Sequence, residues 1–280
     1  MAKKKNKITA NMICETGIRV IFFFAWPALF STAWGGIKMI VEQVKELAAI
    51  ELNSFTLTLI ILLLFTIVFG RFFCGYACAF GSLGDFIYSV SSWIRKKMKK
   101  KPFRVFGKWG DKLLCLKYLL ALGILAAVIA GYNSQISLNS PFTAFSQLYA
   151  RTRPKSSIAL GLFLLIIIGM ALEPRFFCRF LCPMGAVFSL MPILPFSIFK
   201  RDRDQCIPGC SACQRICPAN LELPSTREGD NLKSGQCFSC GKCAGVCPRQ
   251  NAGDSIPKKF RLPMLLLKAA LLFGMIYYIY

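Results

Sequence analysis

The stretch RFFCGYACAFG, residues 71–81, occurs a second time as RFFCRFLCPMG, residues 175–185. The arginine, both phenylalanines, both cysteines and the last glycine coincide at a constant offset of 104 residues. Each copy follows a long apolar run, and two apolar runs separate the copies, so both copies are expected on the same side of a membrane. The sequence therefore predicts a parallel duplication of a two-helix unit, of the kind related by an axis along the membrane normal.

Apolar residues make up 55% of the 280-residue chain and are concentrated in five runs. A helix needs about 20 mostly apolar residues to cross the hydrocarbon core of a bilayer. The first run contains Pro27, where we expect a kink, and the last contains Lys268, whose side chain can extend toward the interface. The runs predict an all-α membrane helical bundle with four to five spanning helices: Ile18–Gly36, Phe55–Arg71, Leu113–Tyr132, Ser157–Leu172 and Leu262–Tyr280.

Lysine and arginine are distributed unevenly among the connecting segments. The N-terminus, residues 95–112 and residues 200–260 are basic, whereas residues 37–54 and 133–156 carry few cations. Basic segments of membrane proteins face the cytoplasm, so we expect a multi-pass protein of the cytoplasmic (inner) membrane, with its N-terminus and residues 200–260 in the cytoplasm. Much of the net charge of +22 is then a topology signal, and no nucleic-acid partner is expected. A cleaved signal peptide is the less favoured alternative for the first run, because no clear cleavage site follows it.

Fourteen cysteines and no histidine define the chemistry of the chain. Thiolates suit iron–sulfur clusters, zinc and Cu(I), whereas the absence of imidazole excludes bis-histidine haem, Rieske centres and histidine acid–base catalysis. Residues 237–248 have the spacing Cys-x2-Cys-x2-Cys-x3-Cys-Pro, which is typical of bacterial ferredoxins. Residues 206–218 have the same spacing with one extra residue in the first loop. A pair of structural zinc sites is the less favoured alternative.

In two-cluster ferredoxins the fourth cysteine of each run binds the other cluster. Cluster I is therefore predicted to use Cys206, Cys210, Cys213 and Cys247, and cluster II to use Cys237, Cys240, Cys243 and Cys217. Since this segment has few large apolar residues, the clusters are expected to hold together a small ferredoxin-like α+β domain of two short hairpins and helical turns. The predicted division is a first membrane repeat with a basic loop (1–112), a second repeat (113–199), the two-cluster domain (200–260) and a C-terminal membrane helix (261–280).

The duplicated motif places two cysteine pairs, Cys74 with Cys78 and Cys178 with Cys182, at the ends of apolar helices. Cysteines four residues apart share one helix face. Two pairs brought together by the repeat would supply four thiolates for a cluster or a tetrahedral metal. The sequence leaves open whether the pairs form one shared site or two separate sites, and ordinary buried cysteines are the less favoured alternative.

Residues near these motifs have simpler expected roles. Arg71 and Arg175 are expected to anchor their helices at the interface, with compensation of thiolate charge as the second interpretation. Glu173 is also expected at the interface. Cys14 and Cys115 are interpreted as ordinary buried cysteines, with a contribution to a membrane cluster as the alternative.

The duplicated Cys-x3-Cys motif, followed by a two-cluster ferredoxin segment, resembles the NapH/NosR/CcoG-type membrane ferredoxins over about residues 15–260. The resemblance implies an electron carrier between a quinol pool or a cytosolic donor and a partner enzyme, or a reductase that serves metal-site assembly. Ala79 differs from the proline that usually follows the first pair, whereas Pro183 follows the second pair.

The leading hypothesis is a membrane-bound electron-transfer subunit with two [4Fe–4S] clusters. The paired cysteines at 74, 78, 178 and 182 are expected to hold either a further iron–sulfur cluster or copper, and no haem is expected. The expected partners are membrane lipid, redox proteins and quinone. The alternative is a reductase that binds and reduces copper at these cysteines for cofactor assembly. A role in an ion-coupled complex is less favoured, because Glu173 is the only acidic residue expected near membrane depth.

Overall fold

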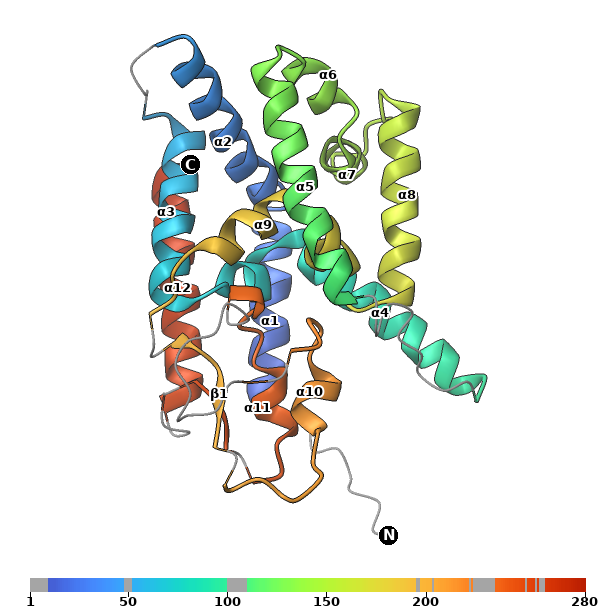
Figure 1. Ribbon diagram of the computed structural model, residues 1–280, viewed down its shortest axis with the longest axis vertical. Coiled ribbons are helices and arrows are strands. Elements are labelled where there is room, and N and C mark those ends of the chain that lie inside the picture. Colours follow the sequence, from blue (N-terminus) through green and yellow to red (C-terminus); the bar gives the residue numbers. More distant parts are fainter. Residues whose placement is uncertain are drawn as a thin grey trace.

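The computed structural model describes residues 10–47, 52–99, 110–194, 197–202, 204–221, 223, 235–249, 251–254, 256 and 260–280. These residues are mostly helical (Figure 1), which confirms the predicted helical bundle in its coarse form. The lysines of the N-terminus and residues 100–109 of the basic connection lie outside the described residues.

Helices occupy all five predicted apolar runs. α1 (Ala10–Ala25) and α2 (Leu29–Lys45) are separated by a bend of 59°. Pro27 lies at this break, as predicted, because its ring and its missing N–H group prevent a continuous helix. The other runs form α3 (Ser54–Phe69), α5 (Gly110–Ile129), α8 (Ser157–Leu172) and α12 (Arg261–Ile279).

Two of these helices, α5 and α12, are long and apolar enough to cross a membrane, and within the described ranges the bent pair α1–α2 is a third candidate. α3 and α8 are apolar but have 16 residues each, which is about 24 Å of helix against a hydrocarbon core of about 30 Å. Each of them begins at a capping side chain: Asn53 accepts a hydrogen bond from the Thr56 N–H, and Ser156 accepts one from the Ala159 N–H. The structure thus supports two to three spans, and the larger number stays a prediction.

The two copies of the motif follow the same backbone path. In each copy an apolar helix is followed by a π-helical turn and a second helix: η1 (Phe73–Ala77) and α4 (Ala79–Lys97) after α3, η2 (Phe177–Leu181) and α9 (Pro183–Leu190) after α8. Cys78 and Cys182 leave their π turns with nearly the same extended geometry, φ/ψ −71°/120° and −73°/115°. Single π turns occur frequently at functional sites. The repeat in the sequence is therefore also a repeat in the backbone.

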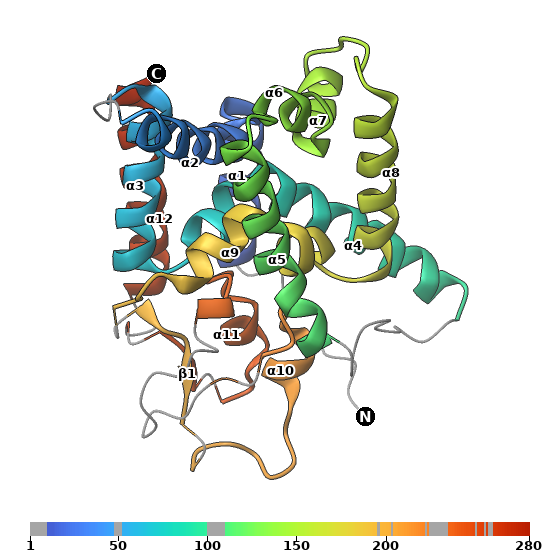
Figure 2. The ribbon, with the colours of Figure 1, turned by 45° about the horizontal axis from the view of Figure 1, so that its top comes forward.

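The cysteine-rich segment lies at one end of the bundle, on the side where α3 and α8 end (Figures 1 and 2). α6 (Asn133–Leu138) and α7 (Pro141–Tyr149), which join α5 to α8, lie at the opposite end. α12 starts beside the cysteine-rich segment and runs back along α3. The segment is thus held between α9 and α12, as the predicted order of elements requires.

Short elements form the cysteine-rich segment: β1 (Lys200–Arg201), α10 (Ala212–Ile216), α11 (Lys242–Val246) and β2 (Ala252–Gly253). β1 pairs antiparallel with β2, with Lys200 opposite Gly253. The described residues therefore contain one two-stranded sheet that joins the two ends of the segment, instead of the two hairpins predicted. α10 and α11 each end directly before the Cys-Pro of their run. The proline ring disfavours helical backbone angles at the preceding residue, which is the cysteine.

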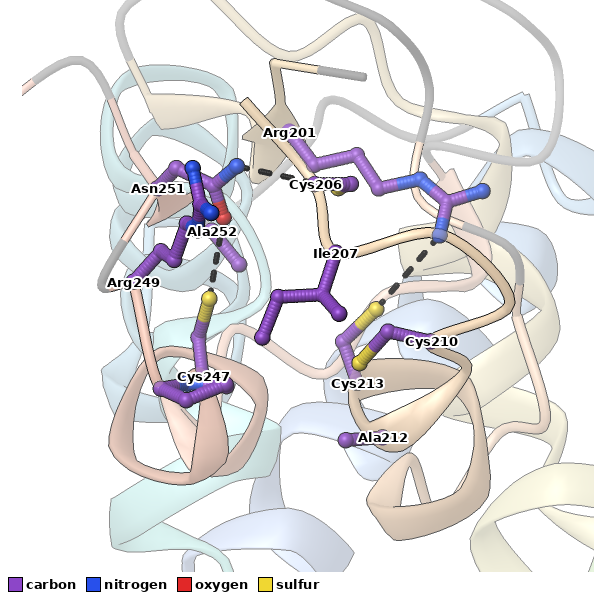
Figure 3. A pocket seen from close by; sticks show the side chains of 11 residues that line it. Arg201, Cys206, Ile207, Cys210, Ala212, Cys213, Cys247, Arg249, Asn251 and Ala252 are labelled. Atoms are coloured by element: carbon purple, nitrogen blue, oxygen red, sulfur yellow. Dashed lines mark hydrogen bonds between the residues drawn. The ribbon is translucent and has the colours of Figure 1, made fainter. Parts of the chain in front are cut away.

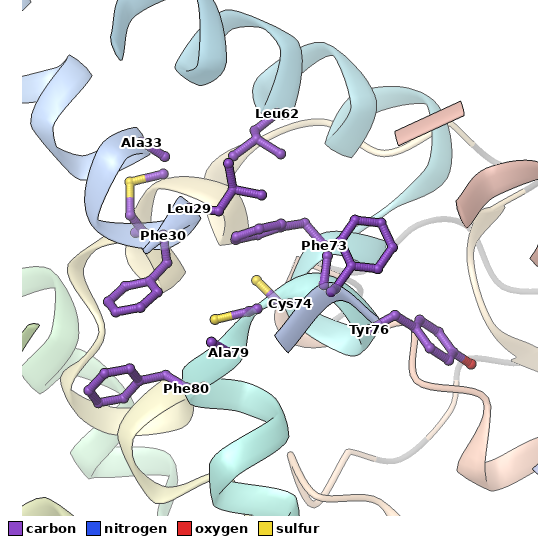
Figure 4. Packing of buried hydrophobic residues seen from close by; sticks show 14 of the residues in the cluster. Leu29, Phe30, Ala33, Leu62, Phe73, Cys74, Tyr76, Ala79 and Phe80 are labelled. Carbon is purple, nitrogen blue, oxygen red and sulfur yellow. The ribbon is translucent and has the colours of Figure 1, made fainter. Parts of the chain in front are cut away.

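Phenylalanines fill the core between the repeats. The ring of Phe80 in α4 lies 4.8 Å from that of Phe30 in α2 and 4.9 Å from that of Phe177 in η2, measured between centroids. Tilted and edge-to-face contacts of this kind add to the stabilisation gained by burial. Figure 4 shows Phe30 and Phe80 near Cys74, so the aromatic core extends up to the cysteine motif.

Candidate iron–sulfur sites

All fourteen cysteines are free thiols, and twelve of them fall into three groups of four. In the described part of the chain, no three Cys, Asp or Glu side chains are arranged to hold a single metal ion. The groups are therefore defined by a common pocket or by mutual electrostatic interaction of their thiols.

The first group lines one pocket in the cysteine-rich segment and consists of Cys206, Cys210, Cys213 and Cys247. Figure 3 shows Cys210 and Cys213 on one side of this pocket, Cys247 on the other and Ile207 between them. These are the four cysteines predicted for cluster I, so the pocket joins three cysteines of the first run to the last cysteine of the second.

Polar side chains at the rim of this pocket contact the sulfur atoms. Arg201 Nη1 lies 3.7 Å from Cys213 Sγ. The Asn251 amide lies between the two runs, because its Nδ2 is 3.6 Å from Cys206 Sγ while its Oδ1 accepts from the Cys247 thiol at 2.9 Å. Positive charge and N–H donors near sulfur stabilise thiolate, the form that binds metal. The donor set therefore fits an iron–sulfur cluster.

The second group is Cys237, Cys240, Cys243 and Cys217, the four predicted for cluster II. Burial raises the pKa of Cys237 to about 12, and neighbouring Cys240 and Cys217 raise it further. Burial, followed by Cys237, Cys240 and Cys217, also raises the pKa of Cys243. Cys217 of the first run is thus close enough to the Cys237 and Cys243 thiols of the second run to interact with them electrostatically. Iron would remove this repulsion by binding all four as thiolates.

The third group lies between the two repeats, and we call it the inter-repeat site: Cys74, Cys78, Cys178 and Cys182. Each of these thiols interacts electrostatically with cysteines of the opposite repeat. Cys74, Cys78 and Cys178 are buried, and Cys182 is partly exposed. The structure thus brings the two pairs together, which favours one shared site over two separate ones.

In each half of the inter-repeat site, a glycine packs against the backbone of the first cysteine of the pair. A Cβ atom at Gly81 would lie 2.9 Å from the Cys74 carbonyl oxygen, and one at Gly185 would lie 3.1 Å from the Cys178 carbonyl oxygen. Both contacts are tighter than a side chain normally tolerates, so the helix after each π turn can start this close to the cysteine only with glycine. In the second repeat, the Gly185 N–H also donates to Cys182 Sγ at 3.2 Å.

The arginines of the motif are buried, and the expectation that they anchor helices at the interface is wrong. Arg71 and Arg175 are each 1% exposed. Arg71 Nη2 lies 3.8 Å from Cys74 Sγ, and Arg175 donates to the backbone oxygens of Cys74 (2.7 Å) and Gly75 (3.0 Å). A buried guanidinium needs partners of this kind, because leaving its donors unpaired is costly. The second interpretation, compensation of thiolate charge, fits these contacts.

Asp85 is a buried charged residue that belongs to none of the sequence motifs. Its carboxylate contacts Arg175 (2.9 Å), Lys242 (3.0 Å) and Arg19 (3.5 Å). Burial by itself would raise the pKa of Asp85, but the three cations outweigh burial and hold this pKa well below its usual range. Its position four residues after the motif glycine, in an otherwise uncharged stretch of α4, is the signal that could have indicated its role.

Two further expectations, on Glu173 and on Cys14 and Cys115, need correction. Glu173 is fully buried and pairs with Arg179 at 3.2 Å, so it is not an interfacial residue. Lys268 is 8% exposed, and its side chain extends toward the cysteine-rich segment, where its Nζ lies 4.0 Å from Asp254. Cys115 is exposed and Cys14 is partly exposed, so neither is an ordinary buried cysteine. Cys115 lies on an exposed position of α5, one of the candidate membrane-spanning helices.

A family model described as a 4Fe-4S binding domain matches the chain at residues 54–101 and at residues 156–194. Each matched segment contains one Cys-x3-Cys pair together with the helices on both sides of it. MJ0749 of Methanocaldococcus jannaschii is 32% identical over 195 residues, which cover 69% of this chain and 68% of that protein. Ferredoxin-type protein NapH of Haemophilus influenzae is 25% identical over 67% of this chain and 63% of its own length.

The chain belongs to the NapH/NosR-type family of membrane ferredoxins. This assignment confirms the resemblance inferred from the motifs and, with the apolar helices, the prediction of a membrane-bound iron–sulfur protein of electron transport. Another relative, Protein NirI of Paracoccus denitrificans, is 27% identical over 82% of this chain, but the chain spans only 35% of NirI. No solved structure matches the chain.

Proposed function

We propose that this family member relays electrons between a cytoplasmic donor or the quinone pool and a partner oxidoreductase. The observation that carries the proposal is the assembly of twelve cysteines into three groups of four, each buried or partly buried and each close to cationic side chains or N–H donors. When bound, an iron–sulfur cluster at each group accepts and releases single electrons. The protein holds the groups in a fixed arrangement.

Ligation follows the three groups. Cluster I is assigned to the pocket of Cys206, Cys210, Cys213 and Cys247, and cluster II to Cys237, Cys240, Cys243 and Cys217. A third cluster is assigned to the inter-repeat site. The match of a 4Fe-4S family model to the two segments that carry the inter-repeat cysteines supports iron there over copper.

Cations next to the inter-repeat site support the same assignment. Arg71, Arg175 and Lys117 are all buried beside its thiols. Four thiolates around an oxidised cubane carry net negative charge, which a low-dielectric interior accepts only with nearby positive charge. Lys117 also donates to the side-chain oxygen of Gln236, the residue before Cys237.

The proposed setting is the cytoplasmic membrane, with the cysteine-rich segment in the cytoplasm. Residues 1–112 and 113–199 form the two membrane repeats, residues 200–260 the two-cluster domain, and residues 261–280 the last membrane helix. α1 begins, and α3 and α8 end, at the end of the bundle where the cysteine-rich segment lies (Figure 1), which agrees with the basic character of both regions.

Iron content tests the proposal. Protein purified without oxygen should contain about twelve iron atoms per chain, four for each of three clusters. Replacing Cys74 and Cys178 by serine should lower the content to about eight, because only the inter-repeat site loses ligands. The matched control replaces Cys14 and Cys115, which belong to no group, and should leave the content unchanged.

Two outcomes contradict the proposal in different ways. Wild-type protein with about four iron atoms or fewer, and with zinc present, would refute an electron carrier. Wild-type protein with about eight iron atoms and copper bound at the inter-repeat site would support the copper reductase instead.

A further inference from the structure

The two copies of the motif differ where they meet the cysteine-rich segment. The first copy has Gly70, Gly75 and Tyr76, and the second has Pro174, Arg179 and Phe180 at the same places. All three residues of the first copy contact the loop that carries Cys237 and Cys240. The residues that differ between the two copies are therefore the ones that contact this loop in the first copy.

Backbone approaches backbone at Gly75. A Cβ atom at this position would lie 2.5 Å from the carbonyl oxygen of Phe238 and 3.5 Å from the Cα of Cys240. No side chain fits into that space, since real Cβ atoms do not approach other heavy atoms so closely. At the equivalent place in the second repeat, Arg179 instead directs its guanidinium to Glu173 at 3.2 Å. The second repeat therefore cannot accept the same loop.

Tyr76 and Gly70 add further contacts. The Tyr76 hydroxyl donates to the Cys240 carbonyl oxygen at 3.2 Å, and Phe180 in the second repeat has no hydroxyl. Gly70 has a φ of +70°, and a Cβ atom there would lie 2.8 Å from Ser239 Oγ. The loop thus lies directly on the start of the first motif.

The arginines of both repeats hold the loop from the other side. Phe238 is 3% exposed, and its ring centroid lies 4.9 Å from the guanidinium carbon of Arg71 and 5.1 Å from that of Arg175. Cation–π contacts of this kind are strong when they are desolvated. Arg71 Nη1 also donates to the Gly235 carbonyl oxygen at 3.3 Å. Arg175 also donates to the backbone oxygens of Cys74 and Gly75, so its guanidinium lies between the Phe238 ring of the loop and the first Cys-x3-Cys pair.

We propose that Gly70, Gly75 and Tyr76 make the first repeat alone the docking surface for the Cys237–Cys240 loop, and that this asymmetry connects cluster II, and not cluster I, to the inter-repeat site. The proposal rests on the ligand assignment given under the proposed function. Cysteines of the first group contact residues of their own segment, namely Asp202, Arg201 and Asn251. The order of sites is therefore cluster I, cluster II, inter-repeat site. Gly70, Gly75 and Tyr76 are positioning residues, since they contact the Cys237–Cys240 loop and not the metal.

Two substitutions test the docking surface. Gly75→Ala introduces the clash with the Phe238 backbone, and Tyr76→Phe removes one hydrogen bond by copying the residue of the second repeat. The matched control is Gly161→Ala, the same substitution at an exposed position of α8 where a Cβ meets nothing within 4 Å. Hydrogen exchange of residues 235–241 in detergent-solubilised protein reports loop docking, and the magnetic coupling between reduced cluster II and the inter-repeat centre reports their separation.

In Gly75→Ala, exchange of residues 235–241 should rise about tenfold or more, the factor that corresponds to about 1.4 kcal/mol. The magnetic coupling should weaken, while the iron content stays at the level of Gly161→Ala. Tyr76→Phe should raise exchange by a smaller factor. If either variant folds, binds full iron and leaves exchange and coupling as in Gly161→Ala, the docking proposal is overturned.

The exchange measurement separates the two proposals. It reports the loop whether or not the inter-repeat site binds metal, so wild-type protein without a third centre would contradict the proposed ligation and leave docking measurable. If Gly75→Ala does not fold, Tyr76→Phe decides, because it removes a single oxygen atom. Unchanged exchange in that variant would then overturn the proposal.

Discussion

Arg175, the first residue of the second motif, binds the carboxylate of Asp85 in the first repeat through two hydrogen bonds, of 3.3 Å from Nε and 2.9 Å from Nη2. Arg71 of the first motif also reaches the opposite repeat, because its Nη2 would lie 3.2 Å from a Cβ atom at Gly185. Each arginine thus crosses to the opposite repeat. Together they join the halves of the inter-repeat site.

Asp85→Asn should destabilise the protein by about 3–5 kcal/mol, because it leaves a buried guanidinium without its counter-charge. Lys242 and Arg19 lose the same partner, so the cysteine-rich segment and α1 should loosen together. Thermal unfolding in detergent, followed by circular dichroism, measures the effect. The control is Glu46→Gln at an exposed position, where a change within about 0.5 kcal/mol is expected. Equal melting temperatures for the two variants would show that the ion pair does not stabilise the fold.

Arg71→Gln should lower the midpoint potential of the inter-repeat centre. A cation near a cluster sulfur favours the reduced, more negative state, and each 1.4 kcal/mol of lost interaction corresponds to about 59 mV for one electron. Arg71→Lys keeps the charge and should recover most of the shift. Redox titration followed by EPR measures both variants. The potential of cluster I is the internal reference, since the arginines that line its pocket are Arg201 and Arg249, and a shift of equal size there would argue against a local effect.

Double substitutions test the exchange of the fourth cysteines between the two runs. Cys206→Ser and Cys247→Ser should each remove about four iron atoms, and the double variant should also remove only about four, because both residues bind cluster I. Cys206→Ser combined with Cys217→Ser should remove about eight. Iron and acid-labile sulfide are measured on protein prepared without oxygen. The reverse pattern would mean that each run binds its own cluster.

Replacing glycine by alanine should lower the stability of the protein at a tightly packed position and raise it at an open position of a helix. Gly81→Ala forces a Cβ against the Cys74 carbonyl oxygen, and overpacking of this kind destabilises by about 1–3 kcal/mol. Gly123→Ala in α5 meets nothing within 4 Å and should stabilise by up to about 1 kcal/mol, because alanine is the better helix former. Thermal unfolding of the two variants in parallel measures the difference. A destabilised Gly123→Ala would show that helix α5 packs more tightly than the structure indicates.

Local patterns accounted for the helices because apolar runs and prolines act over short distances. The bend at Pro27, the start of α8 at Ser157 and the duplicated cysteine motif follow from residues that are neighbours in the chain. Ferredoxin spacing is also local, since three closely spaced cysteines must surround one cluster. The grouping of Cys247 with the first run was predictable only because bacterial ferredoxins exchange their fourth ligands.

The location and the partners of the charged residues near the membrane are the features of the site that the sequence predicts least well. The sequence predicts Arg71, Arg175 and Glu173 at the interface, because a charge at the end of an apolar helix is most often solvated there. Their burial depends on partners that are about 90 or more residues away in the first two cases and on Arg179 in the third. Hydrophobic periodicity in the sequence does not indicate which buried charged residues pair with each other. The same holds for Asp85.

The sequence by itself determined the family, the apolar helices and the cysteines available for metal, because each of these depends on residue type and short-range spacing. Tertiary structure alone decided that the two Cys-x3-Cys pairs lie close to each other, that two arginines cross between the repeats, and that the Cys237–Cys240 loop lies on the first repeat. These features depend on contacts between segments about 100 or more residues apart, such as Arg175 with the Cys74 carbonyl oxygen and the Gly75 backbone with that of Phe238. Only the packing of the whole bundle brings such segments together.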